Sequence, residues 1–293
     1  MPPWLWLAAL AGGLLAAAVL LYWLLALSEG AYLGPGVVTA LYNRVAQRYD
    51  GIKQFDDEDE AYFLGRPIAR FLAGQPGWSH DRPWLLDVAT GTGRLPLAVL
   101  RAGAGDCRVV ALDRAGAMLA EAQRKLAGQG RPDPVFLAHD ASRLPFADGQ
   151  FAVVACLEAL EFMPAPAAAL AEALRVTRPG GLLVVTNRIG RDARLLPGRT
   201  FSRERLADLL RAHGAGGVEI MPWQMDYDLV FAVRQGQASE GAAASWVEML
   251  RCPRCGAQPG PAAGLQPAAI ACPDCRWRLA LNRGLWQLAE DGC

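Results

Sequence analysis

The stretch LLDVATGTGRLPLAVL, residues 85–100, places an acid and two glycines where an apolar run gives way to a helical pattern. The acid is Asp87, and the glycines are Gly91 and Gly93 in the loop that follows it. Glycine lets the backbone approach a ligand closely and turn sharply into a helix. A second acid, Asp113, ends the next apolar run, where a carboxylate accepts hydrogen bonds from ribose hydroxyls. The pattern indicates a site for a ligand that contains a nucleoside.

The chemistry of this loop narrows the choice of ligand. A dinucleotide site normally has a third glycine, and here Pro96 stands in its place. The carboxylate of Asp87 suits a cationic ligand better than a pyrophosphate. S-adenosylmethionine carries an ammonium and a sulfonium on one nucleoside, so we interpret the loop as a site for this cofactor.

Four cysteines near the end of the chain form two C-x-x-C pairs, Cys252 with Cys255 and Cys272 with Cys275. This spacing is typical of a closed zinc site with four thiolate ligands. We therefore predict a small zinc ribbon over residues 248–293, in which the metal has a structural role. Because the ribbon has few apolar residues, we expect it to unfold without zinc, while cofactor binding stays nearly intact.

The segment WLWLAALAGGLLAAAVLLYWLLAL, residues 4–27, contains no charged side chain. As a helix it spans about 36 Å, enough to cross a hydrocarbon core of about 30 Å, and aromatic residues lie near both ends. A secretory signal would have a basic start and a shorter apolar run, and a soluble helix is seldom apolar all round. We predict a single-pass membrane anchor in residues 1–30, with the catalytic body in the cytoplasm because basic residues follow the anchor and none precede it.

Strand and helix patterns alternate between the anchor and the tail. We expect residues 31–80 to form a linker and cap helices, residues 81–235 an α/β domain, and residues 236–247 a second linker. Repeated βα units predict a doubly wound, Rossmann-like parallel sheet. The last two strands are joined too tightly for a crossover helix, so they should form an antiparallel hairpin. Lysine and arginine total 29, as do aspartate and glutamate, so no overall positive field favours nucleic acid.

Four segments resemble, in order and spacing, the motifs of class I S-adenosylmethionine-dependent methyltransferases. They are LLDVATGTGR, VVALDRAGAML, HDASRLPFADGQFAVVAC and ALRVTRPGGLLVVTNR, and the resemblance covers residues 42–234. The segment RVAQRYDGI resembles the aromatic lid of the branch that methylates quinones and small lipids. Two positions depart from the family pattern: Ala89 replaces a frequent glycine and Ala152 a frequent aspartate.

The resemblance implies roles for individual residues. Asp113 is expected to hold the ribose hydroxyls, and Asp140 with Ala141 to contact the adenine. The full set assigned to the cofactor is Tyr49, Asp87, Ala89, Gly91, Gly93, Asp113, Met118, Asp140, Ala141 and Leu157.

The acceptor of the methyl group is less constrained by the sequence. Methyl transfer is an in-line displacement, for which orientation alone supplies roughly 7–11 kcal/mol, so a general base is optional. Glu158 and Glu161 follow the fourth expected strand and are the candidate bases; the other interpretation is that they face solvent. The anchor favours a small acceptor in the lipid phase, such as a quinol or a lipid headgroup. The alternative is an RNA or a protein recognised by the arginine-rich ribbon.

Overall fold

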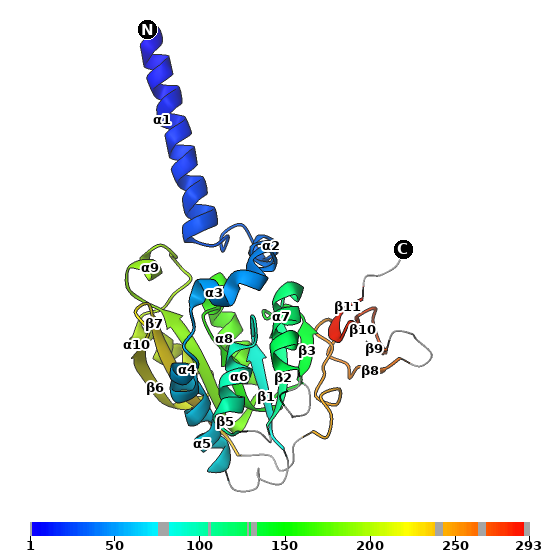
Figure 1. The fold of residues 1–293 in the computed structure, drawn as a ribbon. Coiled ribbons are helices and arrows are strands. Elements are labelled where there is room, and N and C mark those ends of the chain that lie inside the picture. Colours follow the sequence, from blue (N-terminus) through cyan, green and yellow to red (C-terminus); the bar gives the residue numbers. More distant parts are fainter. Residues whose placement is uncertain are drawn as a thin grey trace.

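The computed structural model describes residues 2–75, 82–104, 107–127, 129, 134–237, 243–262 and 268–289 (Figure 1). The α-helices are α1 (Pro3–Tyr22), α2 (Pro35–Val45), α3 (Tyr49–Lys53), α4 (Asp57–Glu60), α5 (Arg66–Ala73), α6 (Arg94–Arg101), α7 (Gly116–Leu126), α8 (Pro166–Val176), α9 (Gly190–Arg194) and α10 (Arg203–Ala212). Shorter helical turns are η1 (Trp23–Leu27), η2 (Ala46–Arg48), η3 (Ala61–Gly65) and η4 (Leu160–Phe162). The strands are β1 (Trp84–Val88), β2 (Arg108–Asp113), β3 (Val135–Ala138), β4 (Phe151–Cys156), β5 (Thr177–Arg188), β6 (Ala215–Trp223), β7 (Tyr227–Arg234), β8 (Gly260–Pro261), β9 (Ala269–Ala271), β10 (Arg278–Asn282) and β11 (Leu285–Leu288).

The strands form one mixed sheet in the order β6-β7-β5-β4-β1-β2-β3-β11-β10-β9-β8. Strands β1 to β5 are parallel, whereas β7 runs antiparallel to β5 and pairs with β6 as the expected hairpin. The chain order reverses beside β1, which has β2 on one side and β4 on the other. Ligands of open α/β sheets bind at such a reversal, beyond the carboxyl ends of the strands.

Both faces of the sheet are covered, which explains the continuous apolar runs in its strands. Leu85 and Leu86 are neighbours on β1 and point to opposite faces. Leu85 belongs to the core that includes residues of α5 and α6, and Leu86 to the core that includes residues of α8 and α10. The predicted Rossmann-like architecture is therefore confirmed.

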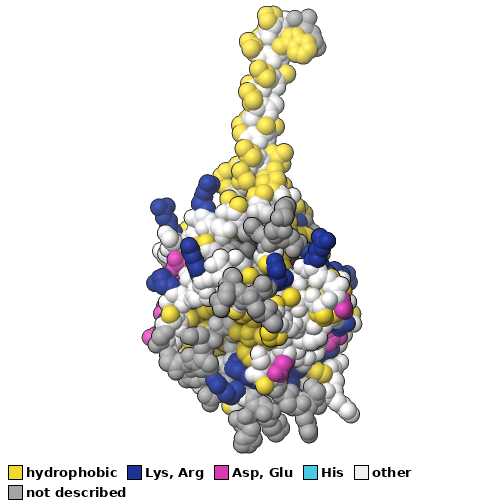
Figure 2. Space-filling view, turned by 90° about the vertical axis from the view of Figure 1, so that its right-hand side faces the viewer, with side chains coloured by type: hydrophobic (Ala, Val, Ile, Leu, Met, Phe, Trp, Pro, Cys, Tyr) yellow, Lys and Arg dark blue, Asp and Glu magenta, His cyan; other side chains and the backbone are white. Residues whose placement is uncertain are grey.

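The N-terminal helix projects away from the body (Figures 1 and 2). Pro3–Leu27 is 25 residues long, none of its most apolar window is buried in the protein, and its length and composition suffice to cross a membrane. The lower end of this helix contacts the body, because the indole nitrogen Nε1 of Trp23 donates a hydrogen bond to the carbonyl of Leu195 at 3.0 Å. The N-terminal helix thus contacts the loop around α9, residues 190–199, as well as being joined to the body through the chain.

The tail continues the central sheet. Strand β11 pairs in parallel with β3, where Leu285 lies opposite Phe136. The residues just before the tail also pack on the body, since Phe146 forms a β-bridge with Leu250. Buried tail residues, including Trp277, share one core with the sheet.

The division into domains stays a prediction, but this packing differs from the separate ribbon that the sequence suggested. Residues 243–247, expected to lie in a linker, contribute the buried Trp246 to the shared core. The boundary at residues 80 and 81 and the middle of the linker, 238–242, lie outside the described residues. The sequence did not predict the pairing of β11 with β3, because the spacing of apolar residues shows which side of a strand is buried but not which distant strand lies beside it.

Candidate cofactor site

A cavity lies beyond the carboxyl ends of β1 to β4, at the position that the strand order favours. Its walls come from α2, from the loops after these strands and from the segment around η4. The lining residues are Pro35, Val38, Thr39, Tyr42, Tyr49, Ala89, Gly91, Leu112, Asp113, Arg114, Ala115, His139, Asp140, Ala141, Leu157, Glu158, Ala159, Phe162, Met163 and Pro164.

The loop after β1 turns through three left-handed residues, Ala89, Gly91 and Gly93, with φ of 56°, 53° and 84°. Glycine adopts this region freely, whereas a side chain costs about 1–2 kcal/mol. Ala89, the residue that departs from the family pattern, therefore holds a strained backbone at the cavity wall. Strain of this kind gathers at ligand sites.

Asp113 fixes the shape of the loop from the end of β2. Its Oδ2 accepts a hydrogen bond from the backbone N–H of Gly91, and its Oδ1 accepts one from Ala115, both at 2.8 Å. Burial raises the pKa of the Asp113 carboxyl, and these two backbone donors oppose that rise. The carboxylate is thereby held rigidly, with its remaining lone pairs available to a ligand in the cavity.

Asp87 lies deeper, 2% exposed, and lines a smaller adjoining cavity. The hydroxyl Oγ1 of Thr90 donates a hydrogen bond to its Oδ2 at 2.6 Å. Burial raises the pKa of Asp87 to about 7, and the neighbouring charge of Asp113 adds to the rise. A cation beside Asp87 would favour its ionised form, which matches an ammonium ligand.

The main cavity brings together most of the residues assigned to the cofactor: Tyr49, Ala89, Gly91, Asp113, Asp140, Ala141 and Leu157. Three do not line it. Asp87 lines the adjoining cavity. Gly93 packs against α7 instead, because a Cβ at this position would lie 3.2 Å from the side chain of Ala122. Met118 is fully buried. Met118 packs in a cluster that includes Tyr49. The individual roles of these residues stay predictions.

Sequence reasoning missed the wall that α2 provides. Tyr42 lines the cavity and donates its hydroxyl hydrogen to Oε2 of Glu29 at 2.9 Å. It also missed His139, which lines the cavity and contacts the tail through the ring of Trp277. Helical periodicity predicted a helix near Tyr42 but carried no signal for the surface it covers. No local pattern distinguished His139 from an ordinary strand residue.

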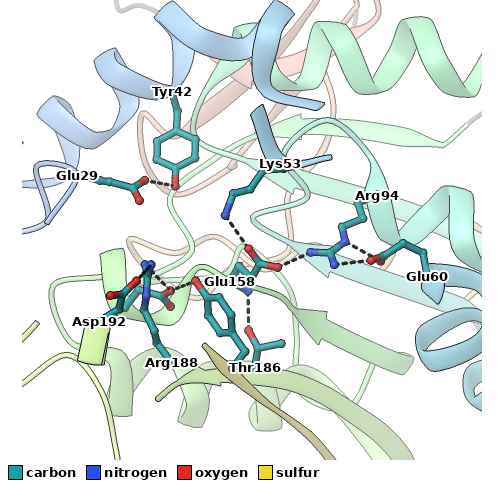
Figure 3. Close-up of polar contacts among 11 residues, drawn as sticks. Glu29, Tyr42, Lys53, Glu60, Arg94, Glu158, Thr186, Arg188 and Asp192 are labelled. Atoms are coloured by element: carbon teal, nitrogen blue, oxygen red, sulfur yellow. Dashed lines mark hydrogen bonds and ion pairs between the residues drawn. The ribbon is translucent and has the colours of Figure 1, made fainter. Parts of the chain in front are cut away.

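Glu158 lies at the centre of an ionic network (Figure 3). Arg94 of α6 contacts its Oε1 at 2.5 Å, and Lys53 of α3 contacts its Oε2 at 2.8 Å. The same guanidinium pairs with Glu60 at 2.5 Å. Burial would raise the pKa of Glu158, but Arg94 and Lys53 outweigh it and hold that pKa below its ordinary value. A carboxylate stabilised in this way is a weak base.

Glu161 differs from Glu158 in its surroundings. It is 1% exposed and does not line the main cavity. The hydroxyl of Tyr227 donates to its Oε1 at 2.6 Å, Nη1 of Arg188 lies 3.8 Å from that oxygen, and Oε2 has no hydrogen-bond partner among the described residues. Burial raises the pKa of Glu161. Neither glutamate faces solvent, so that interpretation of the pair was wrong.

The four predicted metal ligands come together in the tail. The sulfur atoms of Cys252, Cys255, Cys272 and Cys275 all lie within 4.8 Å of one another. Cys255 lies 3.3 Å from Cys272 and 3.8 Å from Cys275, sulfur to sulfur. A tetrahedral zinc ion with Zn–S bonds of about 2.3 Å separates its thiolates by roughly 3.8 Å. The donor set therefore fits zinc, whereas a disulfide needs about 2.05 Å.

Comparison with known proteins shows that the central region of the chain is similar to methyltransferases. Residues 86–185 match a family described as methyltransferase domain. The chain is 38% identical over 151 residues to a demethylmenaquinone methyltransferase of Beutenbergia cavernae, covering 52% of this chain and 58% of that protein. It is 36% identical over 149 residues to the ubiquinone/menaquinone biosynthesis C-methyltransferase UbiE of Methylobacterium nodulans, covering 50% and 57%. The chain thus spans somewhat more than half the length of these relatives.

Solved structures of methyltransferases cover somewhat more than half of the chain. A magnesium protoporphyrin IX methyltransferase from Synechocystis PCC 6803 with bound SAM is 18% identical, with 60% of this chain and 79% of that chain covered and a TM-score of 0.45. A SAM-dependent methyltransferase from Aquifex aeolicus is 20% identical, with 61% and 98% covered and a TM-score of 0.44. The family match spans the loop of Asp87 and the strand end at Asp113, and residues 86–185 are a methyltransferase domain.

Proposed function

We propose that the protein is a membrane-anchored S-adenosylmethionine-dependent methyltransferase, and that its acceptor is a small lipid-phase molecule of the quinol type. The observation that carries the proposal is the set of carboxylates at successive strand ends. Asp87 lies near the end of β1, Asp113 is the last residue of β2 and Asp140 follows β3, and these three residues line two adjoining cavities. The matched methyltransferase domain contains all three.

In this proposal, different residues bind different parts of the cofactor. The carboxylate of Asp113, held by the N–H groups of Gly91 and Ala115, accepts hydrogen bonds from the ribose hydroxyls. Asp87 attracts the ammonium, and Tyr49 covers the cavity from the start of α3. When bound, the cofactor supplies an electrophilic methyl group. The chain contributes mainly orientation and exclusion of water, which suffice for much of an in-line displacement.

The choice of a quinol rests on the relatives and on the cavity wall. The matched relatives named above are both quinone-pathway methyltransferases. Val38, Leu157 and Phe162 give the wall an apolar character that suits a lipid-phase ring. A lipid headgroup is the other small acceptor that the anchor favours, whereas neither named relative supports an RNA or protein acceptor.

Carbon methylation of a quinol requires a proton acceptor. The ring carbon attacks the methyl carbon, the carbon–sulfur bond breaks with its electron pair passing to sulfur, and the ring then loses a proton. Glu158 is stabilised as a carboxylate by two cations, which makes it unsuited to take that proton. Glu161 has the raised pKa that suits a base, but neither it nor its partner Tyr227 lines the main cavity, so it acts only after a shift of η4.

The remaining parts of the proposal concern location and metal. The helix Pro3–Leu27 crosses the membrane once, and the basic residues that follow it keep the catalytic body in the cytoplasm. Zinc at the four cysteines holds the tail in shape and takes no part in the reaction.

The test uses the full-length protein in nanodiscs. Calorimetry should show binding of S-adenosylmethionine, and Asp113→Ala should weaken it by roughly 2–4 kcal/mol because two charge-assisted hydrogen bonds are lost. Labelled cofactor is then supplied with a demethylated menaquinol or with phosphatidylethanolamine. Label in the quinol supports the proposal. Label in the phospholipid alone would replace the quinol by a headgroup, and the absence of cofactor binding would overturn the function.

A further inference from the structure

The loop around α9 joins the anchor to the mouth of the cavity. Besides the bond from Trp23 to Leu195, the hydroxyl of Tyr32 donates to the carbonyl of Pro197 at 2.8 Å. The guanidinium of Arg199 donates to the carbonyl of Ala31 at 3.0 Å and also to the carbonyl of Met163. Since Met163 lines the cavity, one arginine connects the lower end of the anchor to the cavity wall. The body is therefore held in one orientation relative to the helix axis.

The same loop carries two exposed arginines, Arg191 and Arg194. Neither has an ion-pair partner among the described residues, whereas Asp192 between them is paired with Arg188 at 3.0 Å. Arg44 on α2, the helix that follows the anchor, is exposed as well. In Figure 2, several basic side chains stand out from the body near the lower end of the projecting helix, around the hydrophobic side chains at its base. Segments about 150 residues apart in sequence thus contribute uncompensated positive charge beside the anchor.

We propose that Arg44, Arg191 and Arg194 form a docking surface for anionic phospholipid headgroups. The proposal rests on the membrane anchoring proposed above. Basic residues close to an anionic leaflet each gain attraction that fades within a Debye length, so only a surface held against the bilayer benefits. The bonds of Trp23, Tyr32 and Arg199 hold the loop at that level.

Docking of this surface has a consequence for the acceptor. The cavity wall includes Pro35 at the start of α2 and Met163 and Pro164 beside Arg199, so it borders the docking surface. With the arginines on the headgroups, this side of the cavity faces the bilayer. A lipid-phase acceptor then reaches the cavity with less exposure to water.

The experiment compares hydrogen exchange of full-length protein in nanodiscs of phosphatidylcholine alone and with added phosphatidylglycerol. We expect backbone amides in residues 190–199 to exchange roughly 25-fold more slowly in the anionic nanodiscs, the product of about fivefold for each of two arginines. The variant Arg191→Gln/Arg194→Gln should lose this difference. The matched control Arg70→Gln/Arg205→Gln removes two exposed arginines of α5 and α10 and should keep it.

Three results would overturn the docking surface. The first is equal exchange of residues 190–199 in both lipids. The second is that the control variant loses the difference between the two lipids as fully as Arg191→Gln/Arg194→Gln does. The third is protection of residues 190–199 by added RNA in neutral nanodiscs. Failure of the wild-type protein to enter any nanodisc would instead overturn the anchor. Calorimetry with S-adenosylmethionine should give the same affinity for both double variants, which separates docking from the methyltransferase site.

Discussion

The rings of His139 and Trp277 lie edge to face, with centroids 6.3 Å apart and planes at 66°. His139 lines the candidate cofactor cavity, whereas Trp277 lies two residues after Cys275, the last of the four clustered cysteines, and is 2% exposed. The backbone N–H of Trp277 lies 3.5 Å from the sulfur of Cys275, and its carbonyl accepts from Cys272. The backbone and the ring of this one residue therefore connect the cysteine cluster to the cavity wall.

The first prediction is that Trp277→Ala weakens cofactor binding as well as stability. Removing a buried tryptophan costs about 3–5 kcal/mol of unfolding free energy. The freed space behind His139 should also reduce cofactor affinity by about 0.5–2 kcal/mol, the range for mutations in packed networks. Calorimetric titration and thermal unfolding measure the two effects. Arg276→Ala, an exposed neighbour, is the control. Unchanged cofactor affinity in Trp277→Ala would show that the contact is only structural.

The second prediction concerns the metal itself. Cys255→Ser should remove zinc, detectable by elemental mass spectrometry, and should also expose the edge of β3 because β11 pairs with it. The sequence alone suggested that cofactor binding survives loss of the tail. The pairing predicts instead that binding weakens, since Asp140 and Ala141 lie in the cavity-lining segment just after β3. Ser142→Ala keeps the metal ligands and should retain zinc. A zinc-free wild-type protein purified without chelator would contradict the metal site.

The sequence predicted the parts of the fold that depend on local patterns. Apolar runs identified β1 and β4, and the tight turn between β6 and β7 identified an antiparallel hairpin. The spacing of the cysteines predicted a cluster that the structure brings together. The pairing of β11 with β3 escaped prediction because no residue of either strand signals the other.

In the candidate site too, the sequence predicted the residues that belong to local patterns and missed those that depend on tertiary contacts. Asp113 was identified because it ends a strand at a fixed distance from a glycine loop. The role of Arg94 was not predicted, because its partners Glu60 and Glu158 lie 34 and 64 residues away in the sequence and contact it only in the folded protein. The same holds for Arg199, whose contacts with Ala31 and Met163 depend on where α9 lies. Tertiary ion pairs leave no periodic signal in a sequence.

The third prediction is a pH dependence of cofactor affinity that depends on Asp87. Its pKa in the free protein is about 7, and a bound ammonium stabilises the carboxylate and lowers that pKa. Below about pH 7 the cofactor must displace a proton, so affinity should fall by up to about tenfold for each pH unit. Calorimetry between about pH 5.5 and pH 8 measures the slope. Asp87→Asn should bind weakly at every pH with little slope.

Asp140 serves as the control for this slope. The pKa of Asp140 lies below its ordinary value, although burial opposes the shift, because Ser142 and Arg114 stabilise the carboxylate. It stays ionised over the whole range. Asp140→Asn should therefore lower affinity by a constant factor and preserve the slope. A slope that persists in Asp87→Asn would assign the titration to another group.

The fourth prediction concerns Glu158 and folding stability. Glu158→Gln leaves the buried Arg94 with Glu60 alone and Lys53 without its carboxylate, which should cost about 3 kcal/mol of unfolding free energy at pH 7. The pKa of Glu158 is lower in the folded protein than its ordinary value of 4.5. Its contribution is therefore complete above about pH 4.5 and is lost as pH falls through the folded-state value.

Denaturant unfolding of wild type and Glu158→Gln at several pH values tests this expectation. The difference in unfolding free energy should be constant from about pH 8 to pH 5 and shrink towards pH 3. Glu121→Gln is the matched control, because Glu121 pairs with Arg124 on the exposed side of α7 and such pairs contribute about 0–1 kcal/mol. A loss of stability in Glu158→Gln that is no larger than in the control would show that Lys53, Arg94 and Glu60 do not depend on the central carboxylate. Glu158 would then be free to serve the cavity, and its exclusion as a base would have to be withdrawn.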